Sequence, residues 1–155
     1  MKIIRRANES DHAELMELYQ KDIQADEKLA ERFAEDLIYK MKTLVCVEEE
    51  EIVGTVSWQV RGGLEDGVIE LIGLGVDPEF RREGTATKLV DVLIRDANAY
   101  YESQGFPLRF IYLFMRAGNE NARAFYRNMG FTEVSEVPDM FPHDHGILWT
   151  KLLSV

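Results

Sequence analysis

The spacing of apolar positions predicts one strand and two helices in the first third of the chain. Residues 2–7, "KIIRRA", alternate weakly between apolar and polar side chains and indicate a short strand. In residues 10–23 and 28–42 the apolar residues recur three or four positions apart, which is the spacing of an amphipathic helix. On the second helix this spacing puts four apolar side chains on one face: Leu29, Phe33, Leu37 and Met41.

The middle of the chain predicts a hairpin, a long strand and a third helix. Residues 43–60 hold two β-branched runs around an acidic tip, which indicates a hairpin although no Asn-Gly or Asp-Gly turn marks it. A turn at 61–67 leads into an apolar strand at 68–76. The following helix ends before Gly105 and Pro107, two residues that stop helices. Its apolar stripe consists of Ala86, Leu89, Val90, Leu93, Ala97 and Tyr100.

The last third predicts one more helix among three strands. The helix covers residues 119–130, with Asn119 as its N-cap and Gly130 as its stop signal. The strands are 108–115, 131–137 and 146–153. The predicted order is therefore β-α-α-β-β-β-α-β-α-β-β, which indicates an α/β fold around a mixed sheet.

Length and composition favour one globular domain over residues 1–155. The chain has 155 residues, of which 46% are hydrophobic, enough to build a core. It has no apolar run of the ~18 residues that a membrane span needs, and its first residues are too polar for a signal peptide, so we expect a cytoplasmic protein that does not enter membranes. The single cysteine, Cys46, is expected in the core. Two histidines, His143 and His145, lack a third ligand nearby in the sequence, so we expect no metal site.

The charge balance argues against a nucleic-acid partner. The formal net charge is −10, so a phosphate backbone would meet net repulsion. An acidic surface favours a cationic substrate such as an amine, although many proteins have an acidic surface only because it keeps them soluble.

The first candidate chemistry lies in "EFRREGTATKLV", residues 79–90, which takes the chain from a strand into a helix. The first N–H groups of a helix have no internal partners, and the helix dipole puts partial positive charge there, so this end binds anions. Arg81 and Arg82 add fork-shaped donors that suit phosphate oxygens.

The residues after these arginines allow a phosphate to approach the main chain. Gly84 permits a backbone conformation that other residues avoid, and Thr85 and Ala86 are small. We therefore expect a diphosphate ligand. The chain contains no P-loop, and the dinucleotide fingerprint fails because Gly73 and Gly75 are followed by Pro78.

Two motifs carry a resemblance to a known family. The segment "RREGTA" resembles the R/Q-x-x-G-x-G/A motif of the GNAT superfamily of N-acetyltransferases, which binds the pyrophosphate of acetyl-coenzyme A. The segment "NENARAFYRNMGF" is similar to a second motif of that superfamily, N-x-x-A-x-x-x-Y-x-x-x-G-F. The matching positions are Arg81, Gly84 and Ala86 in the first motif, and Asn119, Ala122, Tyr126, Gly130 and Phe131 in the second.

The resemblance implies a mostly antiparallel central sheet of about seven strands flanked by about four helices. It also implies that the strand before the pyrophosphate turn binds the pantetheine arm, with the N–H of Leu74 facing the thioester carbonyl and that of Val76 facing an amide. Gly73 and Gly75 suit a bulge or a close backbone approach there. The implied coenzyme contacts are Leu74, Gly75, Val76, Arg81, Arg82, Glu83, Gly84, Thr85, Ala86, Thr87, Asn119 and Tyr126.

Two catalytic residues follow from the resemblance. Glu70 stands where some members carry a general base, but it would be a poor direct base for an ammonium unless apolar neighbours raise its pKa or a water chain relays the proton. A carboxylate that only pairs with a cation would explain it equally well. Tyr126 matches the tyrosine that protonates the leaving thiolate, although its place on the apolar stripe also fits packing alone. Another branch, which acts on protein N-termini, carries its base where this chain has Phe114, and this departure argues against that branch.

The acceptor pocket in such folds draws on the first two helices and on the loop before the last strand. Here those segments supply Asp22, Asp26, Glu27, Met140 and Phe141. The resulting hypothesis is direct acetyl transfer from acetyl-coenzyme A to a primary amine of a small molecule or peptide, by a monomer or homodimer. Two alternatives stay open: a non-catalytic acyl-coenzyme A sensor, and an acyltransferase that uses a different acyl-coenzyme A.

Overall fold

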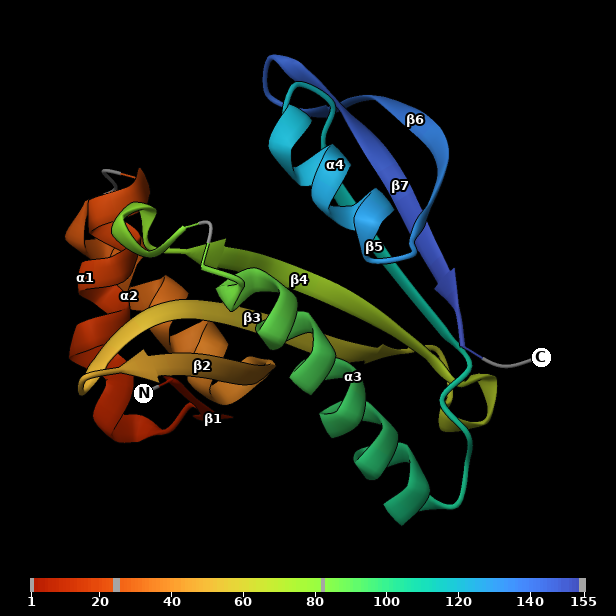
Figure 1. Ribbon diagram of the computed structural model, residues 1–155, viewed down its shortest axis with the longest axis horizontal. Coiled ribbons are helices and arrows are strands. Elements are labelled where there is room, and N and C mark those ends of the chain that lie inside the picture. The colour runs from red at the N-terminus through yellow and green to blue at the C-terminus, as the bar shows by residue number, and fades with distance from the viewer. Residues whose placement is uncertain (1, 24–25, 82, 154–155) are drawn as a thin grey trace. The chain divides into compact units, whose positions relative to one another are not determined.

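The predicted order of elements is confirmed in a computed structural model, which describes residues 2–23, 26–81 and 83–153 (Figure 1). Four short turns of helix join the main elements: η1 (Glu9–Asp11), η2 (Asp36–Lys40), η3 (Leu64–Asp66) and η4 (Pro78–Phe80). The main elements are β1 (Lys2–Arg6), α1 (His12–Ile23), α2 (Glu27–Glu35), β2 (Lys42–Glu48), β3 (Glu51–Arg61), β4 (Val68–Val76), α3 (Thr85–Gln104), β5 (Phe110–Arg116), α4 (Glu120–Asn128), β6 (Thr132–Phe141) and β7 (Asp144–Leu152).

Seven strands form one sheet in the order β1-β2-β3-β4-β5-β7-β6. The described pairings are antiparallel except for β4 with β5, which run parallel. That parallel register pairs Val68, Ile69 and Glu70 with Phe110, Ile111 and Tyr112. The predicted mixed, mostly antiparallel sheet is therefore confirmed.

The predicted hairpin is formed by β2 and β3. Its two-residue tip is Glu49 and Glu50, whose φ angles are 50° and 67°. Two successive positive φ angles are the backbone of a type I′ turn, whose twist matches that of the strands. The hairpin therefore forms without the Asn-Gly or Asp-Gly sequence that usually marks such a turn.

The chain divides into two compact units. Unit 1 consists of Met1–Gln59 and Gly73–Ala97, and unit 2 of Val60–Ile72 and Asn98–Val155. Within the described residues, no helix is both long and apolar enough to cross a bilayer.

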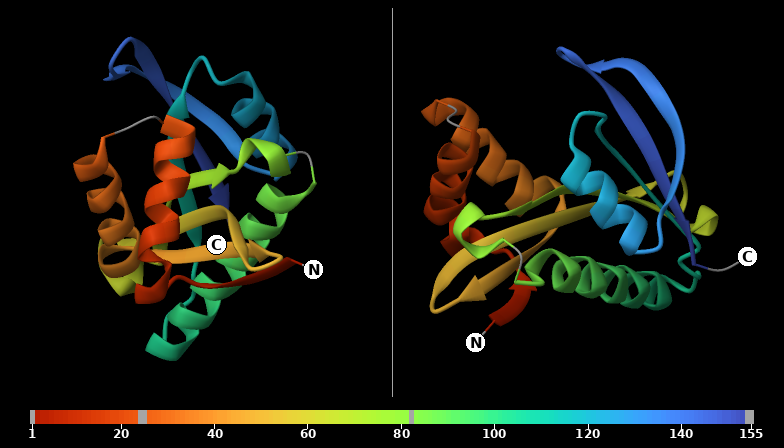
Figure 2. Two further views of the ribbon diagram at one scale, coloured as in Figure 1. Left: turned by 90° about the vertical axis from the view of Figure 1, so that its left-hand side faces the viewer. Right: turned by 45° about the horizontal axis from the view of Figure 1, so that its top comes forward.

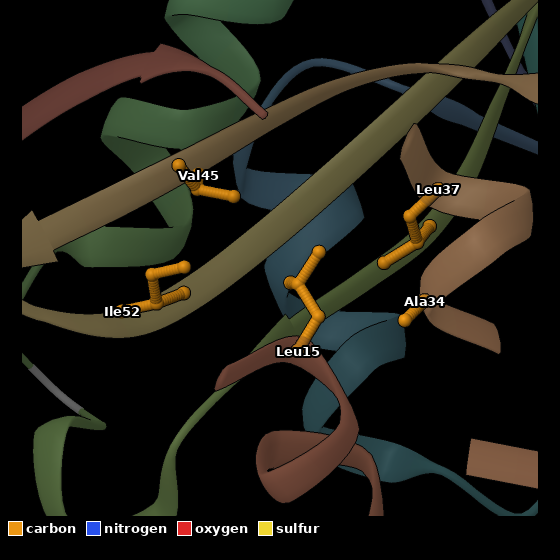
Figure 3. Close-up of a cluster of buried hydrophobic side chains, with 5 residues drawn as sticks. All are labelled: Leu15, Ala34, Leu37, Val45 and Ile52. Atoms are coloured by element: carbon orange, nitrogen blue, oxygen red, sulfur yellow. The ribbon is translucent and has the colours of Figure 1, made fainter. Parts of the chain in front are cut away.

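In unit 1, α1 and α2 pack on β2 and β3 through a cluster of buried apolar side chains (Figure 3). The packing of α2 differs from the prediction. The α-helix ends at Glu35 and continues as the π-helical turn η2. A row of residues four apart drifts around a helix of about 3.6 residues per turn, so Leu29 does not share the face of Leu37. Leu29 is 52% exposed, whereas Ala30, Ala34 and Leu37, which lie on one helical face, are buried. The cluster itself contains Leu15, Ala34, Leu37, Val45 and Ile52.

The first part of α3 lies on the other side of these strands from α1 and α2 (Figure 2). Its predicted stripe is buried at Leu89, Val90, Leu93 and Ala97. Gly54 of β3 lets both the neighbouring strand β4 and the helix α3 approach β3 closely. A Cβ at this position would lie 3.1 Å from the carbonyl oxygen of Gly75 and 3.1 Å from Cδ1 of Leu89.

In unit 2, α4 packs against β7 and the start of β6. Side chains alternate between buried and half-buried along β5, as expected for a strand with one face in a core. From α4, Tyr126 packs against Phe131 and Trp149, with ring centroids 5.5 and 6.3 Å away. The C-terminal end of α3 joins this core through Tyr101, whose hydroxyl donates to the carbonyl oxygen of Val68 at 3.0 Å.

Candidate functional site

The turn after β4 is anchored by Asp77, which is only 3% exposed. Its backbone N–H donates to the carbonyl oxygen of Val53 at 2.8 Å. Its carboxylate accepts from Nζ of Lys21 at 2.8 Å and from the N–H of Glu79 at 3.0 Å. Burial opposes ionisation of this carboxyl group, but the bonds from Lys21 and Glu79 outweigh burial and lower the pKa of Asp77. The turn is thereby fixed to both α1 and β3.

Arg81 folds back over the end of β4. Its Nε donates to the carbonyl oxygen of Val76 at 3.0 Å, and its side chain is on the surface. The structure therefore brings together two of the residues predicted to contact the coenzyme. Arg82, also predicted as a contact, lies outside the described residues.

Gly84 leads the chain into α3 with a φ of +78°, the left-handed conformation expected from the sequence. Nothing lies within 4 Å of the position that a Cβ would take, so steric contact does not require glycine there. Thr85 is buried, Ala86 is half-buried, and Glu83 and Thr87 are exposed. The main chain of this turn and the first N–H groups of α3 thus form a surface-accessible helix start of the kind that binds anions.

Lys2 holds this turn from the far end of the sequence. Its Nζ donates to the carbonyl oxygen of Glu83 at 3.0 Å and to Oγ1 of Thr85 at 2.9 Å. The Glu83 carboxylate lies 3.4 Å from the same ammonium, whose side chain is 13% exposed. A cation near a helix N-terminus adds to the positive end of the dipole and favours an anion nearby. The sequence patterns did not single out Lys2, because no local pattern connects β1 to residue 85.

A cavity of about 170 Å³ lies beside the C-terminal half of β4. Its walls come from α1 (Leu18 and Tyr19), α2 (Phe33), β3 (Thr55) and residues 73–77. The rings of Tyr19 and Phe33 stack with centroids 4.4 Å apart. This arrangement fits the expectation that the first two helices line an acceptor pocket, but with different residues.

Two glycines widen this cavity along β4. Gly73 has a φ of +63°, so the strand departs from regular geometry there, as expected for a bulge. At both Gly73 and Gly75, an added Cβ would have no atom within 4 Å. Leu74, which lies between them, is half-buried and lines the same cavity. The strand therefore presents main chain to open space on this stretch.

In unit 2, Glu70 is engaged by a cation. Its Oε1 accepts from Nε of Arg61 at 2.9 Å and lies 2.8 Å from a terminal nitrogen of the same guanidinium. The hydroxyl of Tyr112 donates to the same oxygen at 3.4 Å. The neighbouring Phe114 packs edge-on against Tyr112, with centroids 5.9 Å apart. These contacts match the cation-paired interpretation of Glu70 that the sequence left open beside a role as base.

The two predicted residues of α4 have distinct surroundings. Tyr126 is 6% exposed, and burial raises its pKa above the ordinary value for tyrosine. Asn119 caps the helix, because its Oδ1 accepts from the N–H of Ala122 at 3.0 Å. The capping role predicted for Asn119 is confirmed.

The predicted acceptor residues are dispersed or already engaged. Asp26 caps α2 by accepting from the N–H of Leu29 at 2.9 Å, and Glu27 is exposed. The side chain of Asp22 lies outside the described part of the chain. Met140 is 40% exposed, while Phe141 lies under the guanidinium of Arg116, with the guanidinium carbon 4.6 Å from the ring centroid.

Cys46 and His145 have structural surroundings. Cys46 is fully buried, as predicted. Nδ1 of His145 accepts from the N–H of Asp139 at 2.9 Å, which supports the turn between β6 and β7.

Comparison with known proteins gives one family and many similar folds. The sequence model of the acetyltransferase (GNAT) family matches residues 9–131. A search of the curated proteins found no match.

Solved structures with similar folds include three N-acetyltransferases or their complexes. The ribosomal-protein-S18-alanine N-acetyltransferase from Escherichia coli has 21% identity and a TM-score of 0.79, over 100% of this chain and 96% of that one. NAA60 of Arabidopsis thaliana in complex with acetyl-CoA has 19% identity and a TM-score of 0.78, over 99% of each chain. An aminoglycoside 6'-N-acetyltransferase complexed with coenzyme A has 19% identity and a TM-score of 0.79, over 99% of this chain and 98% of that one. At these identities the likeness shows the fold alone.

Proposed function

Because the chain belongs to the acetyltransferase (GNAT) family and is an acyltransferase of that family, we propose that it moves an acetyl group from acetyl-coenzyme A directly to a primary amine of a small molecule or peptide. The observation that best supports this proposal is the turn at residues 77–85. It combines a left-handed Gly84, the start of α3 and the ammonium of Lys2 at one place. Such a turn offers main-chain N–H groups at the positive end of a helix dipole to a diphosphate.

The coenzyme would be held mainly by unit 1. The main-chain N–H groups at residues 82–87 would bind the pyrophosphate, with Arg81 beside them. The N–H of Leu74 would face the thioester carbonyl, and that of Val76 an amide of the pantetheine arm. The open space beside Gly73 and Gly75 gives a ligand backbone access to this strand. Two similar structures that contain acetyl-CoA or coenzyme A support this donor.

In the proposed reaction the amine nitrogen attacks the thioester carbon, the C–N bond forms and the C–S bond breaks. The amine loses one proton and the coenzyme thiolate gains one. The N–H of Leu74 would stabilise the oxyanion, and a donor placed in this way is typically worth ~3–4 kcal/mol.

Tyr126 would donate a proton or a hydrogen bond to the leaving thiolate. With ordinary pKa values, full transfer from a phenol to a thiolate is uphill by about 2 kcal/mol. Burial raises the pKa of Tyr126, which makes full transfer harder and keeps the hydroxyl protonated. Hydrogen-bond donation during C–S cleavage is therefore the role that its surroundings favour.

Glu70 would assist removal of the proton from the amine. Its Oε1 lies 2.8 Å from a terminal nitrogen of Arg61, and a carboxylate held in this way would polarise a water that carries the proton to solvent. A purely structural ion pair is the competing explanation, and the variants described in the Discussion separate the two.

The proposed function is tested by measuring coenzyme binding and turnover on the same protein. Calorimetry with coenzyme A should show one site per chain. A screen of amines, amino acids, aminoglycosides and peptides with acetyl-coenzyme A should then release free thiol only when an acceptor is present. Binding without release for any amine would indicate a sensor, and faster release from longer acyl-coenzyme A species would indicate a different donor. Absence of binding would contradict the proposal.

A further inference from the structure

The cavity beside β4 is apolar and lies at the strand to which the thioester is assigned. Its side walls are the stacked rings of Tyr19 and Phe33 together with Leu18. We propose that this cavity binds an apolar side group of the acceptor amine, so that the enzyme prefers acceptors with a hydrocarbon or aromatic group next to the reacting nitrogen. This inference rests on the proposed function and specifies its acceptor class.

The size of the cavity fits one side group. Its volume is about 170 Å³. For comparison, an apolar protein cavity of ~150 Å³ accommodates benzene. The cavity is therefore large enough for a leucine or phenylalanine side chain and is too small for a multi-ring sugar.

The charge of the cavity wall argues against a polycationic acceptor. Asp77 is the charged residue of the wall, and its carboxylate already accepts from Lys21 at 2.8 Å. An aminoglycoside or polyamine needs unpaired carboxylates to replace the water around its ammonium groups. An apolar group gains by leaving water without such a partner.

The position of the cavity favours the acceptor over a longer acyl chain. An attacking nitrogen must come within about 3–3.5 Å of the thioester carbon, so its substituents need room beside Leu74. Leu74 lines the cavity together with Gly73 and Gly75, and an added Cβ at either glycine would meet no atom within 4 Å. Because acetyl carries a single methyl group, most of this volume is left for the acceptor.

A series of tripeptides X-Gly-Gly, with Gly, Leu or Phe as the first residue, tests the inference on the whole protein. The readout is kcat/KM from thiol release at saturating acetyl-coenzyme A, with spermidine and an aminoglycoside as polycationic comparisons. We expect the Leu and Phe peptides to exceed the Gly peptide at least about tenfold, which is typical of an apolar pocket that reads one side chain. Equal values for the three peptides, or higher values for the polycations, would overturn the inference.

Three variants connect this preference to the cavity. Gly75→Ala adds a methyl group in open space at a φ that is not positive, so it should narrow the cavity without strain and lower the Phe-to-Gly peptide ratio at least threefold. Leu18→Ala should widen the cavity and raise the Phe-to-Leu ratio. Leu29→Ala is the matched control, because Leu29 is 52% exposed and lies outside the cavity wall.

Ratios between peptides cancel any shared effect of a variant on stability or coenzyme binding. If Leu18→Ala instead changes the preference between acetyl- and butyryl-coenzyme A and leaves the peptide ratios unchanged, the cavity binds the acyl chain and the inference is wrong. If coenzyme A binds and some amines turn over without any preference for apolar groups, only this inference fails. If coenzyme A does not bind, the proposed function fails first.

Discussion

The ammonium of Lys2 lies 2.9 Å from Oγ1 of Thr85, across 83 positions of sequence. The first strand therefore holds the first residue of α3, at the turn where we place the pyrophosphate. Because the same ammonium also binds the carbonyl oxygen of Glu83, it fixes both sides of Gly84.

The variant Lys2→Met should weaken coenzyme binding. It keeps the hydrocarbon stem but removes two hydrogen bonds from a charged donor, each typically worth ~1.5–3 kcal/mol. If part of this energy orders the turn, the KM for acetyl-coenzyme A should rise about threefold to thirtyfold, with a smaller change in kcat. Lys28→Met is the control, because Lys28 is exposed on α2. An unchanged KM would show that the turn is ordered without Lys2.

The variant Gly84→Glu should abolish coenzyme binding while the protein stays folded. Glutamate adds negative charge at the phosphate site and a strain of roughly 1–2 kcal/mol, because Gly84 has a φ of +78°. Gly105→Glu is a matched control with the same substitution at a φ of +86°, also with no atom within 4 Å of the added Cβ. Both variants should lose similar stability in urea unfolding, and calorimetry should show lost binding only for Gly84→Glu. Equal affinity in the two variants would refute the phosphate assignment.

Substitution of Tyr126 by phenylalanine should lower kcat about tenfold to a hundredfold, the lower range of acid–base effects, and change the KM for acetyl-coenzyme A less than threefold. Tyr101→Phe is the control, because it removes the hydroxyl of another buried tyrosine, which donates to Val68. That control should lose stability without losing kcat. Since burial raises the pKa of Tyr126, loss of its proton should not reduce wild-type kcat up to about pH 9. A decline that begins near neutral pH and disappears in Tyr126→Phe would contradict this assignment.

Glu70→Gln and Arg61→Met separate catalysis from structure at the Glu70 ion pair. If Glu70 assists proton removal, Glu70→Gln should lower kcat about a hundredfold, within the usual range for a general base. Arg61→Met leaves the carboxylate in place and should lower kcat less than tenfold. If the two variants lose similar stability and kcat is unchanged, Glu70 has a structural role only. The measurement is kcat from stopped assays of thiol release across pH 6–9.

Stability should depend on Asp77 at low pH. The pKa of Asp77 is below the ordinary value of 3.8 because Lys21 and the N–H of Glu79 overcome the effect of burial. The ionised carboxylate therefore stabilises the fold at pH values above the ordinary pKa. This contribution is lost as the pH falls through the lowered pKa. Asp77→Asn should reduce the free energy of unfolding by roughly 1–3 kcal/mol at pH 6. Between pH 5 and 3 its stability should fall less steeply than that of the wild type. Asp91→Asn, at an exposed position of α3, should show the wild-type slope in urea titrations.

Local signals in the sequence predicted the elements of the fold. Helix spacing, strand alternation and stop residues such as Gly105 placed all eleven main elements in the observed order. The N-cap at Asn119 and the left-handed Gly84 were equally predictable, because each depends on its own residue and the next few positions.

Contacts between distant segments could not be predicted in the same way. The bonds from Lys2 to Thr85 and from Lys21 to Asp77 depend on how whole elements pack, and no short pattern encodes them. The π-helical turn at Asp36–Lys40 also had no signature in the sequence. The apolar pattern did not show whether α2 would bury the face of Ala30 or that of Leu29, because this depends on how the helix packs on the strands. The sequence likewise pointed to three acidic residues of the first two helices and to Met140 and Phe141 as acceptor residues. The cavity is instead lined on its helical side by Leu18, Tyr19 and Phe33.

Gly54 has a consequence for how mutational data on this protein should be interpreted. Any side chain at this position would press on the carbonyl oxygen of Gly75 and on Leu89, so it would displace β4 and α3 together. A random library scored by activity would then rank position 54 with the catalytic residues, although Gly54 is buried and carries no reactive group. Intolerance there would report the spacing between layers, and only a parallel measurement of folded protein would separate it from chemistry.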